Sequence, residues 1–195
     1  MQDAFDQDVT IYIMTYNDSA SLVSCLRRLA IQNLHPKVVV VDYGSIDGTV
    51  ELLEQQIKVN YYGFSIRFEK IKFDGGKAKA KIHFKTEACK ECTTKYMMFL
   101  TADILIPRFS IVHLITMLEK NEKIAVAGLK YNGKCVDHVQ FGATVLRCSI
   151  AKKVSWNLKN QCTCRNARDL IKGWGYHLVD HPILTAIRIK DILEW

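Results

Sequence analysis

Three short polar clusters hold the residues of this chain that are best suited to chemistry. The first is Thr15-Tyr16-Asn17, the second runs from Asp42 to Thr49, and the third is Thr101-Ala102-Asp103. Carboxylates accept hydrogen bonds, bind hard cations such as Mg²⁺ and Mn²⁺, and act as general bases when they are well placed. Each cluster follows an apolar run, so the element before it must set its position.

Those apolar runs are typical of buried strands. Residues 9–14, 37–41 and 96–100 are rich in β-branched, aromatic and other apolar side chains. Helical spacing follows the first run, at Leu22, Leu26 and Leu29, with Asp18 or Ser19 as the expected cap. Strands that alternate with helices predict a parallel sheet, and the carboxyl ends of parallel strands form the ligand crevice. The three clusters are therefore expected to converge at one edge.

The remaining elements are predicted from the same signals of period, turn residues and β-branched content. Further helices are expected at 50–56, 78–91 and 110–120, and further strands at 66–68, 124–129 and 141–146. Residues 155–168 are polar and fit neither pattern, and residues 182–195 show the apolar spacing of an amphipathic helix. Arg188 and Lys190 lie in that last segment, so peripheral contact with an anionic membrane is one interpretation of it.

Composition predicts one compact globular domain. The chain has 195 residues, of which 49% are apolar and 24% charged. It has no run of 18 apolar residues that could span a bilayer, and its first residues carry acids where a secretory signal carries lysines. A cytoplasmic location is the expectation. The pairs Cys89/Cys92 and Cys162/Cys164 suggest zinc or redox chemistry, although cysteines without such a role are the favoured interpretation.

The net charge of +7 favours polyanionic partners. These include phosphorylated ligands, nucleic acid and an anionic membrane face. The sequence shows no helix-turn-helix, zinc-finger spacing or aromatic RNA-binding signature. A nucleic-acid-binding α/β protein is therefore kept as the alternative rather than the first interpretation.

Taken together, the clusters resemble the motifs of family-2 glycosyltransferases of the GT-A fold. In that family a strand ends in Thr-Tyr-Asn, the next in an Asp-x-Gly-Ser-x-Asp-Gly-Thr loop, and a later one in a metal-binding Asp-x-Asp. The resemblance covers residues 9–129 in the same order and the remainder more loosely. It implies a Rossmann-like, mainly parallel twisted sheet flanked by helices. Residues 9–129 would bind the nucleotide-sugar and residues 130–195 would supply the acceptor side and the base. The small size suits a minimal member, such as one from an archaeal virus.

The resemblance also implies roles for individual residues on the donor side. Asp42 would accept a hydrogen bond from the donor's base. Lys81, where the family usually has arginine, would meet the base or the phosphates, with Lys77 and Lys79 as further candidates. The other residues expected to bind the nucleotide-sugar are Thr15, Tyr16, Asn17, Gly44, Ser45, Thr101, Ala102 and Asp103.

Metal and base assignments follow from the same resemblance. Asp103 matches the last aspartate of the metal motif and would hold Mn²⁺ or Mg²⁺, with His181 as an added ligand. Thr101 stands where the first aspartate would be. Asp180 matches the family's base, with Asp137 and Asp169 as alternatives.

The implied activity is an inverting, metal-dependent transfer of a sugar from a UDP- or GDP-sugar to a hydroxyl of a glycan, protein or lipid. Two departures from the family pattern keep a catalytically inactive relative as an alternative. They are Thr101 and Val179, which replaces a glutamate.

Overall fold

The computed structural model describes residue 5 and residues 8–131, 139–157 and 162–189. Apart from the short strand β5, strands and helices alternate up to Lys130, and the pattern is less regular after it, as the sequence predicts. The strands are β1 (Val9–Thr15), β2 (Lys37–Asp42), β3 (Ile66–Lys70), β4 (Tyr96–Thr101), β5 (Ile104–Leu105), β6 (Ile124–Lys130), β7 (Ala143–Arg147), β8 (His177–Thr185) and β9 (Ile187–Arg188). The helices are α1 (Ser19–Ala30), α2 (Thr49–Lys58), α3 (Gly76–Glu91), α4 (Ser110–Lys120), α5 (Cys148–Ala151) and α6 (Thr163–Gly173).

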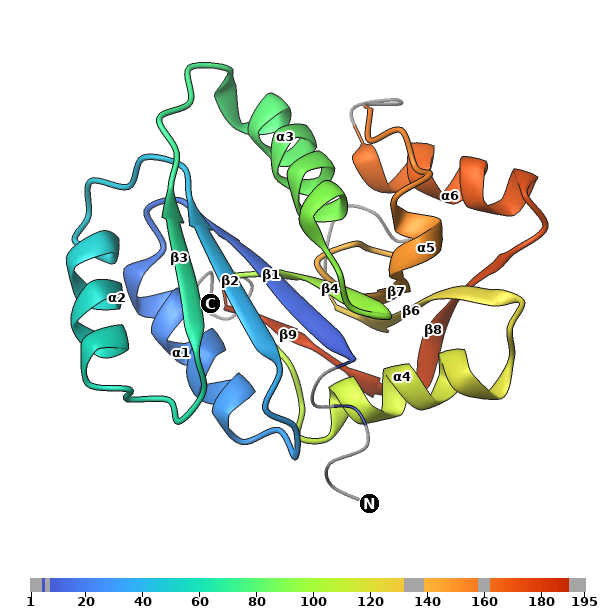
Figure 1. The fold of residues 1–195 in the computed structure, drawn as a ribbon, viewed down its shortest axis with the longest axis horizontal. Coiled ribbons are helices and arrows are strands. Elements are labelled where there is room, and N and C mark those ends of the chain that lie inside the picture. The colour runs from blue at the N-terminus through green and yellow to red at the C-terminus, as the bar shows by residue number, and fades with distance from the viewer. Residues whose placement is uncertain (1–4, 6–7, 132–138, 158–161, 190–195) are drawn as a thin grey trace.

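Seven of these strands form one twisted sheet in the order β3-β2-β1-β4-β7-β6-β8 (Figure 1). Neighbours in the first half, β3-β2-β1-β4, are all parallel. β7 is antiparallel to both β4 and β6, and β8 is parallel to β6. The predicted α/β architecture with a mainly parallel sheet is confirmed, and β7 and β8 of the second half complete the sheet of the first.

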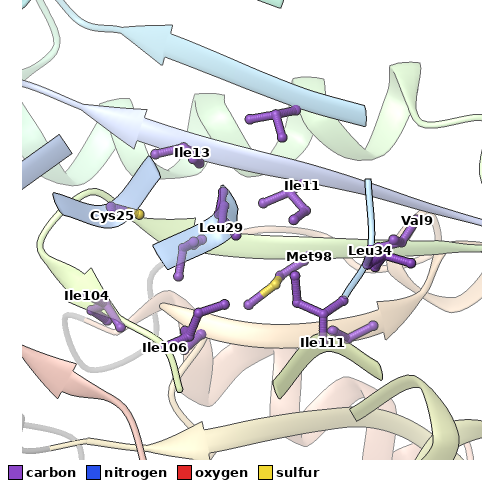
Figure 2. Close-up of a cluster of buried hydrophobic side chains, with 14 of the residues drawn as sticks. Val9, Ile11, Ile13, Cys25, Leu29, Leu34, Met98, Ile104, Ile106 and Ile111 are labelled. Carbon is purple, nitrogen blue, oxygen red and sulfur yellow. The ribbon is translucent and has the colours of Figure 1, made fainter. Parts of the chain in front are cut away.

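Helices cover both faces of the sheet because its central strands are apolar on both sides (Figure 1). One face packs against α1, α2 and α4, and the other against α3, α5 and α6. Figure 2 shows the first interface, where Ile11 and Ile13 of β1 and Met98 of β4 lie near Leu29 of α1 and Ile111 of α4. The buried central strands give the loops at their ends a rigid support.

The helix expected over residues 182–195 is wrong for residues 182–188. Residues 177–185 form β8 and residues 187–188 form β9, while residues 190–195 lie outside the described part. β-branched side chains at Ile183, Thr185 and Ile187 favour extended backbone. Pro182 is tolerated because β8 is an edge strand, where a missing N–H need not break a ladder. The amphipathic helix proposed for membrane contact is therefore absent from residues 182–188.

The smaller predictions can be compared with the structure in turn. The ambiguous stretch 155–168 contains the first half of helix α6, and the strand expected at 141–146 is present as β7. Asp18 occupies the residue before α1 without capping it through its side chain. The six described cysteines are free thiols, and Cys135 lies outside the described residues. No described helix has both the length and the apolar character that a membrane crossing requires.

Candidate donor site at the carboxyl edge of the sheet

Adjacent strands bring the three polar clusters together. β1 lies between β2 and β4, with Thr15 in register with Asp42 on one side and Met14 in register with Thr101 on the other. Since all three strands are parallel, their carboxyl ends reach the same edge. The loops after them therefore form one surface.

Asp42 organises the loop that follows β2. Its carboxylate is buried, and Oδ1 accepts the backbone N–H groups of Gly44 and Ser45, each at 2.9 Å. The Ser45 hydroxyl donates to Oδ2. Gly44 supplies the left-handed backbone of this turn, with φ of 88°. A carboxylate held in this way fixes the loop, and any contact with a nucleotide base would add to these bonds.

Asn17 joins the first loop to the second. Its backbone N–H donates to Ser45 Oγ at 2.8 Å, and its Oδ1 accepts the N–H of Ile46 at 2.8 Å. Asn17 has a φ of 50°, a left-handed conformation that asparagine tolerates better than most side chains. The Thr-Tyr-Asn cluster and the Asp42 loop thus form one hydrogen-bonded unit.

A pocket of about 300 Å³ opens beside this unit. It lies between the carboxyl ends of β1 and β4 and the first turns of α3. The residues that line it are Met14, Thr15, Tyr16, Asp18, Tyr43, Phe73, Gly76, Lys77, Ala80, Lys81, Thr101, Ala102, Asp103 and Arg188.

The pocket brings together about half of the site residues predicted from sequence. Those that line it are Thr15, Tyr16, Lys81, Thr101, Ala102 and Asp103. Asn17, Asp42, Gly44 and Ser45 build the neighbouring loops instead of lining the pocket. Asp180 and His181 lie on β8, which two strands separate from β4. At the usual strand spacing, that places them roughly 14 Å across the sheet from β4.

Asp180 faces the side of the sheet that α3 covers. It is in register with Gly128 of β6, and its Oδ1 lies 3.4 Å from the position that a Cβ would occupy on that glycine. The same position contacts Val139, which belongs to the apolar cluster under α3. The carboxylate is thus on the pocket's side of the sheet but outside its lining. Of the alternative bases, Asp169 pairs with Arg168 at 2.8 Å and Asp137 lies outside the described residues.

His181 is held by its own strand. Its Nδ1 accepts the backbone N–H groups of Ile183 at 3.2 Å and Leu184 at 2.9 Å. Burial and, to a lesser extent, the nearby His113 lower the pKa of His181, which favours the neutral ring. Only Nε2 remains to act as a ligand, and the ring meets that of His113 on α4 edge to face, with centroids 5.6 Å apart.

Sequence reasoning missed three residues that shape the pocket: Arg188, Tyr43 and Phe73. Tyr43 and Phe73 meet edge to face with ring centroids 5.7 Å apart, and the Tyr43 hydroxyl lies 2.9 Å from His83 Nδ1. This apolar wall suits the flat face of a nucleotide base. Tyr43 stands inside the Asp42 motif, which could have signalled it. Arg188 gave no local signal, because it lay in a segment that was expected to be helical.

Arg188 is paired with Asp103, the residue that was expected to hold a divalent cation. Its Nε donates to Asp103 Oδ2 at 2.9 Å, and the Asp103 side chain is only 9% exposed. No group of three or more histidine, cysteine, aspartate or glutamate side chains suited to a metal occurs among the described residues. A dication about 4 Å from a guanidinium would be repelled by roughly 8 kcal/mol at an effective dielectric constant near 20. As they stand, these residues do not fit a divalent metal ion.

Comparison with known proteins identifies the class. The sequence model of glycosyl transferase family 2 matches residues 10–169, and the chain belongs to this family. No curated protein sequence gives a significant match.

Solved structures with the same fold include three informative neighbours. The mannosyltransferase PcManGT from Pyrobaculum calidifontis, in complex with GDP-Man and Mn²⁺, has a TM-score of 0.75 at 16% identity, covering 93% of this chain and 56% of that one. TarS 1-349 from S. aureus has a TM-score of 0.68 at 16% identity, covering 96% of this chain and 62% of that one. Glucosyl-3-phosphoglycerate synthase from Mycobacterium tuberculosis, with Mn²⁺, UDP and phosphoglyceric acid, has a TM-score of 0.63 at 15% identity, covering 89% and 67%.

The chain thus has the GT-A fold of these glycosyltransferases. It spans about 56% and 62% of the length of the first two.

Proposed function

We propose that the chain transfers a sugar from a nucleoside-diphosphate sugar to an acceptor hydroxyl with inversion at the anomeric carbon. The observation that carries this proposal is the pocket at the carboxyl ends of β1 and β4, built from the family's motifs in a chain that belongs to the family. Neighbours of the same fold are complexed with GDP-Man or UDP, which supports a donor of that chemical class.

The pocket offers each part of such a donor a matching surface. Tyr43 and Phe73 present aromatic faces to a base, next to the loop that Asp42 holds. Lys77 and Lys81 project from the start of α3 and would meet the phosphates. The sugar would then lie toward Thr101 and the strands beyond β4, on the side from which Asp180 approaches.

Asp180 is the proposed base of the transfer. In an inverting reaction the acceptor oxygen attacks the anomeric carbon and the bond from that carbon to the diphosphate oxygen breaks. The diphosphate leaves with the electron pair, and the acceptor's proton passes to the carboxylate. Support for Asp180 is its position on the pocket's side of the sheet and its match to the family motif. The distance across two strands leaves space for an acceptor between base and donor.

Dependence on Mn²⁺ or Mg²⁺, with Asp103 and His181 as ligands, stays a prediction from the resemblance. Mn²⁺ or Mg²⁺ is present in several neighbours, where such an ion would stabilise the charge of the departing diphosphate. The paired state of Asp103 argues against that role here, so no step of the proposal depends on a metal. The donor sugar, the acceptor class, a cytoplasmic location and a viral origin also stay predictions.

A panel of UDP- and GDP-sugars, incubated with the chain and assayed for released nucleoside diphosphate, tests the activity. With an active donor, Asp180→Asn should lower kcat by about 100-fold or more and leave the donor Kd within about threefold, because the base acts only in the transition state. Asp169→Asn is the matched control, since that aspartate lies on α6 and pairs with Arg168. Normal turnover in Asp180→Asn, or loss of it in Asp169→Asn, would assign the base elsewhere.

The net charge of +7 supports a second candidate, binding to nucleic acid. Filter binding to random duplex across a salt series separates the two. Tight retention that falls steeply with salt would favour nucleic acid, whereas weak retention together with nucleotide-sugar turnover supports the transferase. Nucleotide binding without turnover of any donor would instead indicate a catalytically inactive relative.

A further inference from the structure

A short strand pair delivers a guanidinium to the donor pocket. β5 follows directly after Asp103, and β9 contains Arg188. The two strands are antiparallel, with Ile104 in register with Arg188, and the N–H of Ile189 donates to the Asp103 carbonyl at 2.8 Å. Backbone pairing between β5 and β9 therefore fixes the position of the Arg188 backbone, from which its side chain extends.

The Arg188 side chain is also held at its far end. Its Nε bonds to Asp103 Oδ2 at 2.9 Å, while the side chain keeps a third of its surface exposed and lines the pocket. A guanidinium with a fixed plane presents its N–H donors in a fork that matches phosphate oxygens. Asp103 thus orients a phosphate-binding group toward the pocket.

Lysines on α3 add to this positive charge. The described lining of the pocket carries Lys77, Lys81 and Arg188 against the carboxylates of Asp18 and Asp103. Burial lowers the pKa of Lys81, and repulsion from Lys77, Lys85 and Arg188 contributes to the same shift. Cations that repel one another across a pocket are stabilised when an anion enters it.

We propose that Arg188, positioned by Asp103 and assisted by Lys81, binds the donor's diphosphate in the place of a divalent cation, so that nucleotide binding needs no metal. This inference rests on the proposed function, since it assigns the group that receives the diphosphate of that donor. Fixed cations neutralise the charge that the diphosphate gains when its bond to the sugar breaks. Asp103 is then a positioning residue that acts through Arg188.

Calorimetric titration of UDP and GDP into the chain tests the inference, once in excess EDTA and once in Mn²⁺. The nucleotide that binds should do so in EDTA with a Kd within about threefold of its value in Mn²⁺. Arg188→Met should weaken that binding about tenfold or more in EDTA, as expected for a lost charge-assisted hydrogen bond. Lys81→Met should weaken it in the same direction, which keeps the test valid if the Arg188 variant folds poorly.

Two further variants complete the design. Arg188→Lys keeps the charge but not the fork, so its affinity should fall between those of the wild type and Arg188→Met. Arg67→Met is the matched control, because Arg67 is also paired with a carboxylate, that of Glu91, and is not part of the pocket lining. It should leave nucleotide affinity unchanged.

The outcomes separate this inference from the proposed function. Binding that requires Mn²⁺ and is insensitive to Arg188→Met would overturn the inference and leave the transferase proposal standing. Absence of nucleotide binding in both conditions would overturn both. Binding in EDTA that depends on Arg188 supports both.

Discussion

At the scale of single residues, Asp47 shows how one carboxylate can hold two helices. Its Oδ2 accepts the N–H of Ser19, the first residue of α1, at 3.2 Å. Its Oδ1 accepts the N–H of Thr49, the first residue of α2, at 3.1 Å, and the Thr49 hydroxyl also donates to it. Unpaired N–H groups and the helix dipole both favour a negative charge there. The motif aspartate therefore has a structural role that needs no ligand.

Hydrogen bonds also determine the direction in which the pKa of Asp47 shifts. Burial pushes its pKa upward, but the hydrogen bonds from the Thr49 side chain and from the N–H groups of Ser19 and Thr49 outweigh burial and lower it overall. A carboxyl whose pKa is lower in the folded chain stabilises the fold above its unfolded pKa. That contribution is lost as the pH falls through the folded pKa.

We predict that Asp47→Ala lowers the free energy of unfolding at pH 7 by about 1 kcal/mol, a typical loss for a helix cap. The difference in unfolding free energy between variant and wild type should begin to shrink below the ordinary aspartate pKa of about 4 and disappear as the pH falls through the lower pKa of the folded chain. Urea denaturation at a series of pH values measures it. A difference in unfolding free energy that stays constant down to pH 2 would mean that the charge of Asp47 contributes nothing to stability.

At the scale of elements, α3 is joined to α6 and β4 by a buried lysine. Lys85 of α3 donates from Nζ to Thr163 Oγ1 of α6 at 2.9 Å. The same ammonium lies 5.7, 5.3 and 5.0 Å from the ring centroids of Phe99, Phe141 and Trp156. Three aromatic faces and a hydroxyl replace the water that a buried ammonium loses. This contact stabilises α3, whose first turns supply the pocket's lysines.

We predict that Lys85→Ala lowers the free energy of unfolding by about 2–4 kcal/mol, because it removes the cation–π contacts and leaves a cavity. Lys85→Met should cost less, since it refills most of the volume with an apolar chain. Lys90→Ala on the same helix is the control: its side chain is two-thirds exposed and pairs with Glu87, so the change should stay within about 0.5 kcal/mol. Urea denaturation of the three variants checks the order, and equal losses in all three would contradict it.

At the scale of the whole molecule, β7 joins the two halves of the sheet, β3-β2-β1-β4 and β6-β8. It lies between β4 of the first half and β6, and β6 in turn carries β8 with Asp180. Gly128 of β6 lets these strands pack closely, because a Cβ there would lie 2.7 Å from Thr144 Cγ2 and 2.8 Å from Val139 Cγ1. Both neighbours are buried and β-branched, so they have little freedom to move away.

We predict that Gly128→Ala lowers the free energy of unfolding by about 1–3 kcal/mol through overpacking. Turnover should fall as well, since the added methyl would also crowd the carboxylate of Asp180. Gly173→Ala at the end of α6 is the control, because a Cβ there meets nothing within 4 Å and should be neutral or slightly stabilising. Thermal unfolding and a turnover assay test both variants. Wild-type stability of Gly128→Ala would show that Thr144 and Val139 can move away from the added methyl group.

The sequence predicted the first half of the molecule well because its signals are local. Apolar runs at β1, β2 and β4, each followed by a polar motif, indicate both the strand and the loop after it. The parallel order then implies that Thr15, Asp42 and Thr101 approach one edge, as their register shows. Side-chain placement within that edge was not predictable, because Asp42 is turned into its own loop by hydrogen bonds that motif matching does not reveal.

The sequence by itself determined the family, the sheet and the edge where the polar loops meet, since these depend on patterns within about 15 residues of chain. Only the tertiary structure decided what stands beside Asp103. Arg188 lies 85 positions further along, in a segment whose apolar spacing resembled a helix, and edge pairing with β5 made it a strand. Strand pairing is a non-local interaction whose partner is selected by packing, so no local pattern could indicate that a guanidinium would lie against that carboxylate.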